Sequence, residues 1–321
     1  MLQNYVAGRT MAETERTPVT PSRSVRVMSP TEQRNPRTLA IDRADPLAVL
    51  RMLNAEDSRV AGEVAKVLPL LAVLAEVTAD RLRAGGRLHY FGAGTSGRTA
   101  VVDAAELGPT FSLPAGIVVA HHAGGAAALT TAVEGSEDSE ELGAADAAAV
   151  EPGDVAVGIA ASGRTPYVAG ALAAARQAGA FTALVSSNPE APLADLADLH
   201  IGVDTGPEAI AGSTRLKAAT AHKLVLNGLS TAVMIALGRT YSNLMVDLSA
   251  SNAKLRGRLV TILMEATGLG EEPCSRALAE ADGQLKTALV CLLSGCAPED
   301  ARQRLAAVDG RVSAAVAASM S

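Results

Sequence analysis

Apolar residues between positions 45 and 83 recur every three or four residues, which is the spacing of an amphipathic helix. After residue 86 the pattern changes to short apolar runs separated by Ala-rich helical stretches, such as residues 168–178. The runs predict strands at residues 87–91, 116–120, 154–160, 181–185 and 199–203. Strands that alternate with helices are typical of an α/β fold, here a three-layer α/β/α sandwich with a central parallel sheet.

The remaining patterns predict how the chain is divided. A capping sequence, Gly212-Ser213-Thr214, precedes residues that are apolar on nearly all sides, so residues 213–237 are expected to form a long buried helix. A small bundle of three helices is expected after Gly268, with breaks at Gly283, Gly295 and Pro298. We therefore expect a disordered extension over residues 1–30, an α/β domain with N-terminal helices over 31–256, and a helical bundle over 257–321.

Composition narrows the classes of function. A net charge of −6 argues against a nucleic-acid surface, which needs clustered basic side chains. No apolar run reaches the roughly 20 residues of a membrane span. Three cysteines lack the spacing of metal ligands and indicate reduced thiols in a cytoplasmic protein without a metal site: Cys274, Cys291 and Cys296.

The same four residues occur twice, each time directly after an apolar run: Ser96-Gly97-Arg98-Thr99 and Ser162-Gly163-Arg164-Thr165. Each predicts a hydroxyl-rich turn that opens a helix, where N–H groups and hydroxyls at the positive end of the helix dipole can hold a phosphate. Because parallel strands end at the same edge of a sheet, two such turns predict one anion held from two sides. The alternative for either turn is a purely structural one, in which the glycine only permits a tight bend.

Two acidic positions are candidates for proton transfer. Glu106 follows Ser96 by ten residues on the same predicted helix, and its apolar sequence neighbours would desolvate the carboxyl group and raise its pKa, as a general acid requires. The alternative is a solvated glutamate on an amphipathic face. An acidic cluster at residues 134–138 follows a helix expected over residues 126–133, and it is either a solvated helix end or the source of a general base.

Several stretches, taken together and in this order, resemble the N-acetylmuramic acid 6-phosphate etherases of the sugar-isomerase (SIS) superfamily. They are residues 31–35, 54–57, 92–98, 132–138, 158–167, 212–215 and 243–247. The resemblance covers nearly everything from Thr31 to the C-terminus. It implies the SIS fold with a C-terminal bundle like a ubiquitin-associated domain, and a homodimer with sites near the subunit interface.

The resemblance also implies an activity: a lyase without a cofactor that cleaves the D-lactyl ether at C3 of N-acetylmuramic acid 6-phosphate during cell-wall recycling. The family's catalytic glutamates fall on Glu106 and Glu137. Glu106 is expected to protonate the leaving oxygen and later to activate water, and Glu137 to remove the C2 proton. The residues implied in substrate binding are Thr95, Ser96, Ser162 and Thr165 with the N–H of Gly163 for the phosphate, and Glu208 and Ser213 for the sugar.

The chain departs from the family pattern at Ala105, Gly108, Ala219 and His222, where Ser, Pro, Gly and Gln are usual. These changes spare both glutamates but bear on the shape of the pocket. Two alternatives remain on the same fold: a sugar-phosphate isomerase and a non-catalytic sugar-phosphate-binding regulator. Release of lactate from the muramyl substrate distinguishes the etherase from both.

Overall fold

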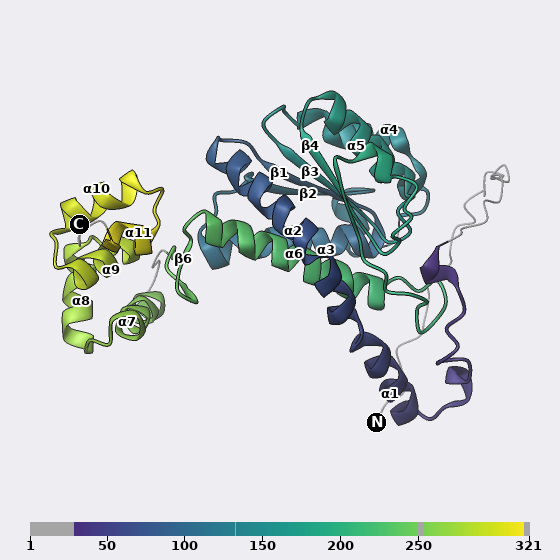
Figure 1. Cartoon of the computed structure of the whole chain (residues 1–321), viewed down its shortest axis with the longest axis horizontal. Coiled ribbons are helices and arrows are strands. Elements are labelled where there is room, and N and C mark those ends of the chain that lie inside the picture. The colour runs from purple at the N-terminus through teal and green to yellow at the C-terminus, as the bar shows by residue number, and fades with distance from the viewer. Residues whose placement is uncertain (1–28, 132, 249–252, 318–321) are drawn as a thin grey trace, which may run out of the picture.

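A five-stranded parallel sheet forms the centre of the molecule. The computed structural model describes residues 29–131, 133–248 and 253–317. The strand order is β2-β1-β3-β4-β5, and every neighbouring pair is parallel. The strands are β1 (Leu88–Gly92), β2 (Val118–His122), β3 (Val155–Ala160), β4 (Phe181–Ser186) and β5 (Leu199–Gly202). All five predicted strands are confirmed, and Figure 1 shows β1 to β4 side by side.

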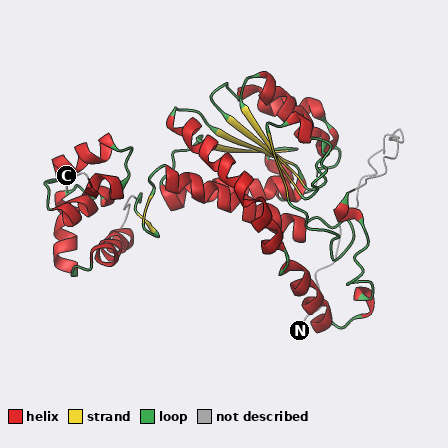
Figure 2. Cartoon of the chain, in the orientation of Figure 1, coloured by secondary structure: helices red, strands yellow, loops and turns green. Residues whose placement is uncertain are grey.

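Helices cover both faces of this sheet (Figure 2). The helices α2 (Val60–Arg83), α3 (Gly94–Phe111) and α6 (Lys217–Ala236) pack on one face. On the other face lie α4 (Glu140–Asp146) and α5 (Pro166–Gln177). Side chains of strand β3 point to both layers of helices. Val155, Val157 and Ile159 enter the core under α2, α3 and α6, while Ala156 and Ala160 enter the core under α4 and α5. The three-layer sandwich is thus confirmed.

The helical pattern over residues 45–83 forms two helices, α1 (Pro46–Asp57) and α2. Helix α1 begins where the Asp45 carboxylate accepts a hydrogen bond from the Ala48 N–H, and Pro46 occupies its first position. Two short 3₁₀ turns, η1 (Pro30–Glu32) and η2 (Ile41–Arg43), precede it. Of the expected N-terminal extension, residues 1–28 lie outside the described residues.

Two predicted helices are shorter than expected. Helix α6 begins at Lys217, not at residue 213, because the Glu208 carboxylate rather than a hydroxyl caps it: Oε2 and Oε1 accept from the N–H groups of Lys217 and Ala218, each at 2.9 Å. The helix predicted over residues 126–133 is only a 3₁₀ turn, η3 (Ala126–Leu129). The Arg98 side chain binds the carbonyls that a longer helix would have used.

The C-terminal helices share a second core, and Figure 1 shows them as a separate group beyond β6 and the end of α6. They follow a hairpin of β6 (Thr240–Tyr241) and β7 (Leu244–Met245) and are α7 (Ala253–Thr267), α8 (Glu271–Glu280), α9 (Leu285–Ser294), α10 (Pro298–Ala307) and α11 (Val312–Ala317). The prediction of three helices after residue 268 is wrong by one, because the short α11 adds Val312 and Ala315 to this core. The expected boundary at residue 256 falls inside α7, and the division into domains stays a prediction.

Candidate active site

The first Ser-Gly-Arg-Thr motif lies within the first turns of a helix. Strand β1 ends at Gly92 and α3 begins at Gly94, so Thr95 and Ser96 are the second and third residues of α3. In the described part of the chain, no side chain caps this end of the helix. The first N–H groups of a helix have no intrahelical acceptor and lie at the positive end of its dipole. This helix end is therefore able to bind an anion.

The second motif has a different backbone, although the sequence predicted equivalent turns. Ser162, Gly163 and Arg164 lie in the loop after β3, and Thr165 is the N-cap of α5. The Gly163 N–H, which the resemblance assigns to the phosphate, donates instead to the Ala160 carbonyl at 2.9 Å. Among the described residues, the side-chain hydroxyls of Ser162 and Thr165 have no hydrogen-bond partner, and both remain able to donate to a ligand.

The glycine of each motif is required, but for different reasons. A Cβ on Gly97 would lie 2.5 Å from the Gly92 carbonyl oxygen, so only glycine lets α3 start this close to the end of β1. Gly163 has a positive φ of 67°, and a Cβ there would lie 2.3 Å from the Ala191 Cβ. Both glycines therefore have the structural role that the sequence left open. The turns that they permit place hydroxyls at the ends of two neighbouring strands, β1 and β3.

A buried histidine joins the first motif to a third strand. His222 on α6 is 1% exposed, and burial lowers its pKa to about 4. Its Nδ1 lies 3.3 Å from the Ser96 Oγ, and its Nε2 lies 3.4 Å from the Oγ of Ser187, which directly follows β4. Sequence reasoning noted His222 only as a departure from the family pattern. The link could not be seen because 126 residues separate His222 from Ser96.

Glu106 is exposed in the single chain, as the alternative interpretation of its sequence expected. The expected desolvation by apolar neighbours is not seen, because the helical period turns Asp103 and Leu107 inward and leaves Glu106 outward together with Val102, which is 62% exposed. Glu137 is also exposed, in the 3₁₀ turn η4 (Ser136–Asp138). The catalytic roles of both glutamates stay predictions.

The segment that leads to Glu137 is anchored to the start of α3. The Arg98 side chain donates from Nε to the Leu129 carbonyl at 2.9 Å and from Nη2 to the Ala128 carbonyl at 2.8 Å. The arginine of the second motif differs, because the Nε of Arg164 is buried without a partner among the described residues. Arg98 therefore holds the loop that follows β2 against the first turns of α3.

The remaining predicted residues lie near the start of α6. Glu208 is fully buried, and desolvation raises its pKa although both its oxygens accept backbone N–H groups. Its contact with the sugar stays a prediction beside this capping role. Ser213 is half-buried in the turn before α6, and its hydroxyl has no hydrogen-bond partner within the described part of the chain.

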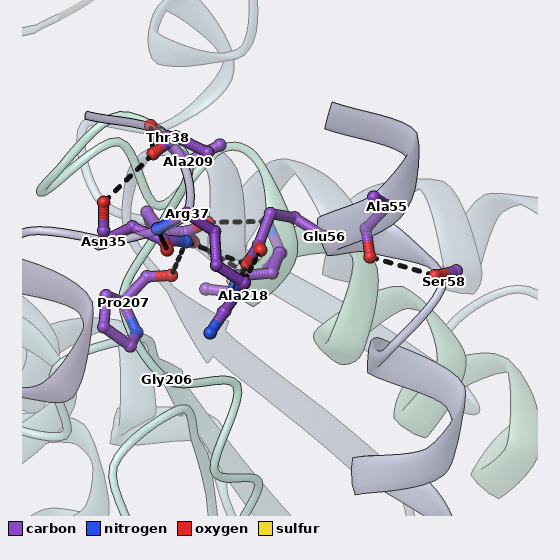
Figure 3. Close-up of polar contacts among 12 residues, drawn as sticks. Asn35, Arg37, Thr38, Ala55, Glu56, Ser58, Gly206, Pro207, Ala209 and Ala218 are labelled. Atoms are coloured by element: carbon purple, nitrogen blue, oxygen red, sulfur yellow. Dashed lines mark hydrogen bonds and ion pairs between the residues drawn. The ribbon is translucent and has the colours of Figure 1, made fainter. Parts of the chain in front are cut away.

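The start of α6 also belongs to a buried ion network that sequence reasoning missed (Figure 3). Glu56 is 2% exposed, and its Oε2 accepts from Asn35 Nδ2, Arg37 Nη2 and Lys217 Nζ, each at 2.8 Å. These contacts, led by the hydrogen bonds from Arg37, lower the pKa of Glu56 to about 2 despite its burial. The network joins the N-terminal segment and α1 to the first residue of α6. Asn35 and Glu56 belong to two of the stretches that carry the family resemblance, residues 31–35 and 54–57.

Neither a metal cluster nor a membrane helix is found in the parts of the chain that the structure covers. No group of three or more His, Cys, Asp or Glu residues there could hold a metal ion. None of the helices there combines the length and the apolar character that crossing a membrane requires.

Comparison with known proteins gives strong relatives over most of the chain. It is 60% identical over 268 residues to the N-acetylmuramic acid 6-phosphate etherase of Thermobifida fusca, covering 84% of this chain and 88% of that protein. Etherases of the same name from Symbiobacterium thermophilum and Serratia proteamaculans are 53% and 48% identical, covering 83% and 89% of this chain and 89% and 97% of theirs.

Family models match the sheet region. Residues 127–226 match the SIS domain, and residues 70–176 match the N-terminal SIS domain of glucokinase regulatory protein. A solved phosphoheptose isomerase from Francisella tularensis is 19% identical with a TM-score of 0.49, covering 60% of this chain and all of that one. The match to the SIS model agrees with the parallel sheet and the helices on both its faces.

Proposed function

Because the chain belongs to the N-acetylmuramic acid 6-phosphate etherase family, we propose that it cleaves the D-lactyl ether of N-acetylmuramic acid 6-phosphate. The products are N-acetylglucosamine 6-phosphate and D-lactate. One structural observation carries the proposal: within the described residues, the hydroxyls of Ser162 and Thr165 lack a hydrogen-bond partner and the start of α3 lacks a side-chain cap, and both lie at the ends of neighbouring strands, where a phosphate can bind. The enzyme is then a carbon–oxygen lyase of peptidoglycan recycling. Its three free cysteines suit a cytoplasmic location.

The phosphate is held by neutral donors. Thr95 and Ser96 supply hydroxyls and the open N-terminus of α3, and Ser162 and Thr165 supply hydroxyls from the neighbouring loop. Hydrogen bonds to a charged acceptor are stronger than those between neutral groups, and several of them replace the phosphate's hydration. This grip fixes the sugar by its C6 end and leaves C2 and C3 to the carboxylates.

The reaction needs one base and one acid. Opening of the sugar ring exposes the C1 aldehyde, which makes the C2 proton acidic. The Glu137 carboxylate removes this proton, and the electron pair expels the lactyl oxygen from C3 as protonated Glu106 donates its proton to it. Water then adds to C3 of the unsaturated aldehyde, with Glu106 as base, and C2 regains a proton from Glu137.

Geometry favours a site shared between two copies of the chain. Ser96 and Glu106 are ten residues apart on one helix, which corresponds to about 15 Å along its axis. The separation along the backbone is longer than the distance from the phosphate to C3 of a hexose 6-phosphate, and α3 also turns Glu106 outward, on the same side as the exposed Val102. We therefore assign the acid to Glu106 of the partner subunit in a homodimer. The exposed Val102, one turn from Glu106, supplies apolar surface for such a contact.

The proposal is tested by measuring D-lactate released from N-acetylmuramic acid 6-phosphate. Glu106→Gln and Glu137→Gln each keep a hydrogen-bonding side chain but cannot exchange the proton, so each is expected to lower kcat by about 10²–10⁴-fold. Affinity for N-acetylglucosamine 6-phosphate should change by less than about threefold, because the phosphate grip is untouched. Glu134→Gln, also exposed in the acidic cluster, is the matched control and should retain lactate release.

The alternatives give different results in the same assay. An isomerase would rearrange a sugar phosphate without forming lactate, and a regulator would bind it without turnover. Wild-type protein that releases no lactate would exclude the etherase function. Equal losses of binding and turnover in the glutamate variants would show that these residues only support the fold.

A further inference from the structure

His222 lies between two serine hydroxyls at the edge of the sheet where the phosphate is proposed to bind. Its Nδ1 is 3.3 Å from the Ser96 Oγ, and its Nε2 is 3.4 Å from the Ser187 Oγ. His222 is 1% exposed and Ser187 is fully buried, so water does not satisfy their polar atoms. Within the described residues, each ring nitrogen has one hydrogen-bond partner.

The state of the imidazole follows from burial and hydrogen-bond satisfaction. Desolvation lowers the pKa of His222 to about 4, so near neutral pH the ring carries one N–H and one lone pair. The Ser187 hydroxyl has no acceptor among the described residues other than Nε2. A buried hydroxyl proton without an acceptor is costly, so Ser187 donates to Nε2. The ring proton is then on Nδ1, and it is donated to the Ser96 Oγ.

We propose that His222 is a positioning residue that donates to Ser96 and thereby leaves the Ser96 hydroxyl proton free for the phosphate of the substrate. A phosphate dianion only accepts hydrogen bonds, so Ser96 must donate to it. With the opposite tautomer, Ser96 would donate to Nδ1 and present lone pairs to the anion. Ser187 donates to His222, His222 donates to Ser96, and the Ser96 hydroxyl donates to the phosphate. This inference rests on the proposed function, in which Ser96 binds the phosphate.

Two substitutions separate the hydrogen bond from the packing of the side chain. His222→Leu fills the space but removes both polar atoms, and it should raise KM for N-acetylmuramic acid 6-phosphate about tenfold with less than about a threefold change in kcat. His222→Gln carries one donor group and one acceptor, so it should restore KM to within about threefold of wild type. A merely structural role would show no such rescue and no split between KM and kcat.

The tautomer itself can be measured without catalysis. In wild-type protein labelled with ¹⁵N-histidine, the His222 resonances, assigned by their loss in His222→Gln, should show the proton on Nδ1, both free and with N-acetylglucosamine 6-phosphate bound. Ser187→Ala removes the donor to Nε2 and should raise the population protonated on Nε2. It leaves Ser96 in place.

Protonation on Nε2 in the wild type would overturn the proposal. An unchanged affinity of folded His222→Leu for N-acetylglucosamine 6-phosphate would also overturn it. If His222→Leu does not fold, the wild-type tautomer still decides. A protein that shows the Nδ1 proton but releases no lactate would contradict the etherase function alone.

Discussion

Single residues set the stability of the region around the start of α6, and Glu56 is the clearest case. Its carboxylate is buried against Arg37 and Lys217, with Asn35 as a further donor. Removing one member of a buried ionic group leaves the others without compensation. The N-terminal segment should therefore depend on Glu56 far more than on any exposed ion pair.

Glu56→Gln should lower the free energy of unfolding by about 3 kcal/mol at pH 7. The pKa of Glu56 falls from 4.5 to about 2 on folding, so its contribution is fully present above pH 4.5 and is lost as the pH falls toward 2. The free energy of unfolding, measured with urea, should therefore differ less between wild type and variant as the pH falls below 4.5. Glu63→Gln is the control, because its pair with Lys66 is exposed and one helical turn apart, and it should cost less than about 1 kcal/mol. A difference that stays constant with pH would contradict this account.

At the residue scale, the sequence indicated which residues could bind a ligand, but it did not indicate which distant side chains they contact. The hydroxyls of Thr95 and Ser162 could be found because each follows an apolar run directly. The pairs Ser96–His222 and Glu56–Lys217 could not, since 126 and 161 residues separate them and nothing local indicates which distant side chain fills a buried position. Glu106 was ambiguous for a related reason: apolar neighbours in sequence do not show which way a helix turns a side chain.

At the scale of elements, the two identical motifs show what local sequence does not decide. All five strands could be predicted from apolar runs, and the three inner strands β1, β3 and β4 show why: they are buried on both faces, which makes such runs nearly continuous. The starts of α3, α5 and α6 could not be predicted to the residue. Each depends on a contact made outside the helix: the Gly92 carbonyl lies against Gly97, Ala191 lies against Gly163, and the Glu208 carboxylate caps α6.

The close packing of α3 on β1 leads to a test at this scale. Gly97→Ala would place a Cβ 2.5 Å from the Gly92 oxygen, so α3 must shift and carry Ser96 with it. We expect a loss of about 1–3 kcal/mol in the free energy of unfolding, measured with urea, and an increase in KM. Gly62→Ala in α2 is the matched control. Its Cβ meets no atom within 4 Å, and the change should stabilise the protein by about 0.5–1 kcal/mol. Equal effects of the two substitutions would show that α3 is not closely packed on β1.

At the scale of the whole molecule, the order of the sheet brings the candidate binding residues together. Strands β1, β3 and β4 are neighbours, so Ser96, Ser162 and Ser187 follow adjacent carboxyl ends. The sequence predicted that Ser96 and Ser162 share the carboxyl edge of the sheet, because the predicted strands were parallel. It could not predict that α3 carries Glu106 away from the hydroxyls of its own chain, because that conclusion needs the length and direction of the helix. The proposed assignment of Glu106 to the partner subunit follows from this direction of the helix.

A mixed dimer tests the shared site most directly. Glu106→Gln and Glu137→Gln chains carrying different affinity tags are co-expressed, the mixed dimer is isolated through both tags, and its release of D-lactate is measured. If Glu106 acts across the interface, one of the two sites keeps both carboxylates, and the mixed dimer should show about half of the wild-type rate. A mixed dimer no more active than either variant alone would contradict the account, because both glutamates would then belong to one chain.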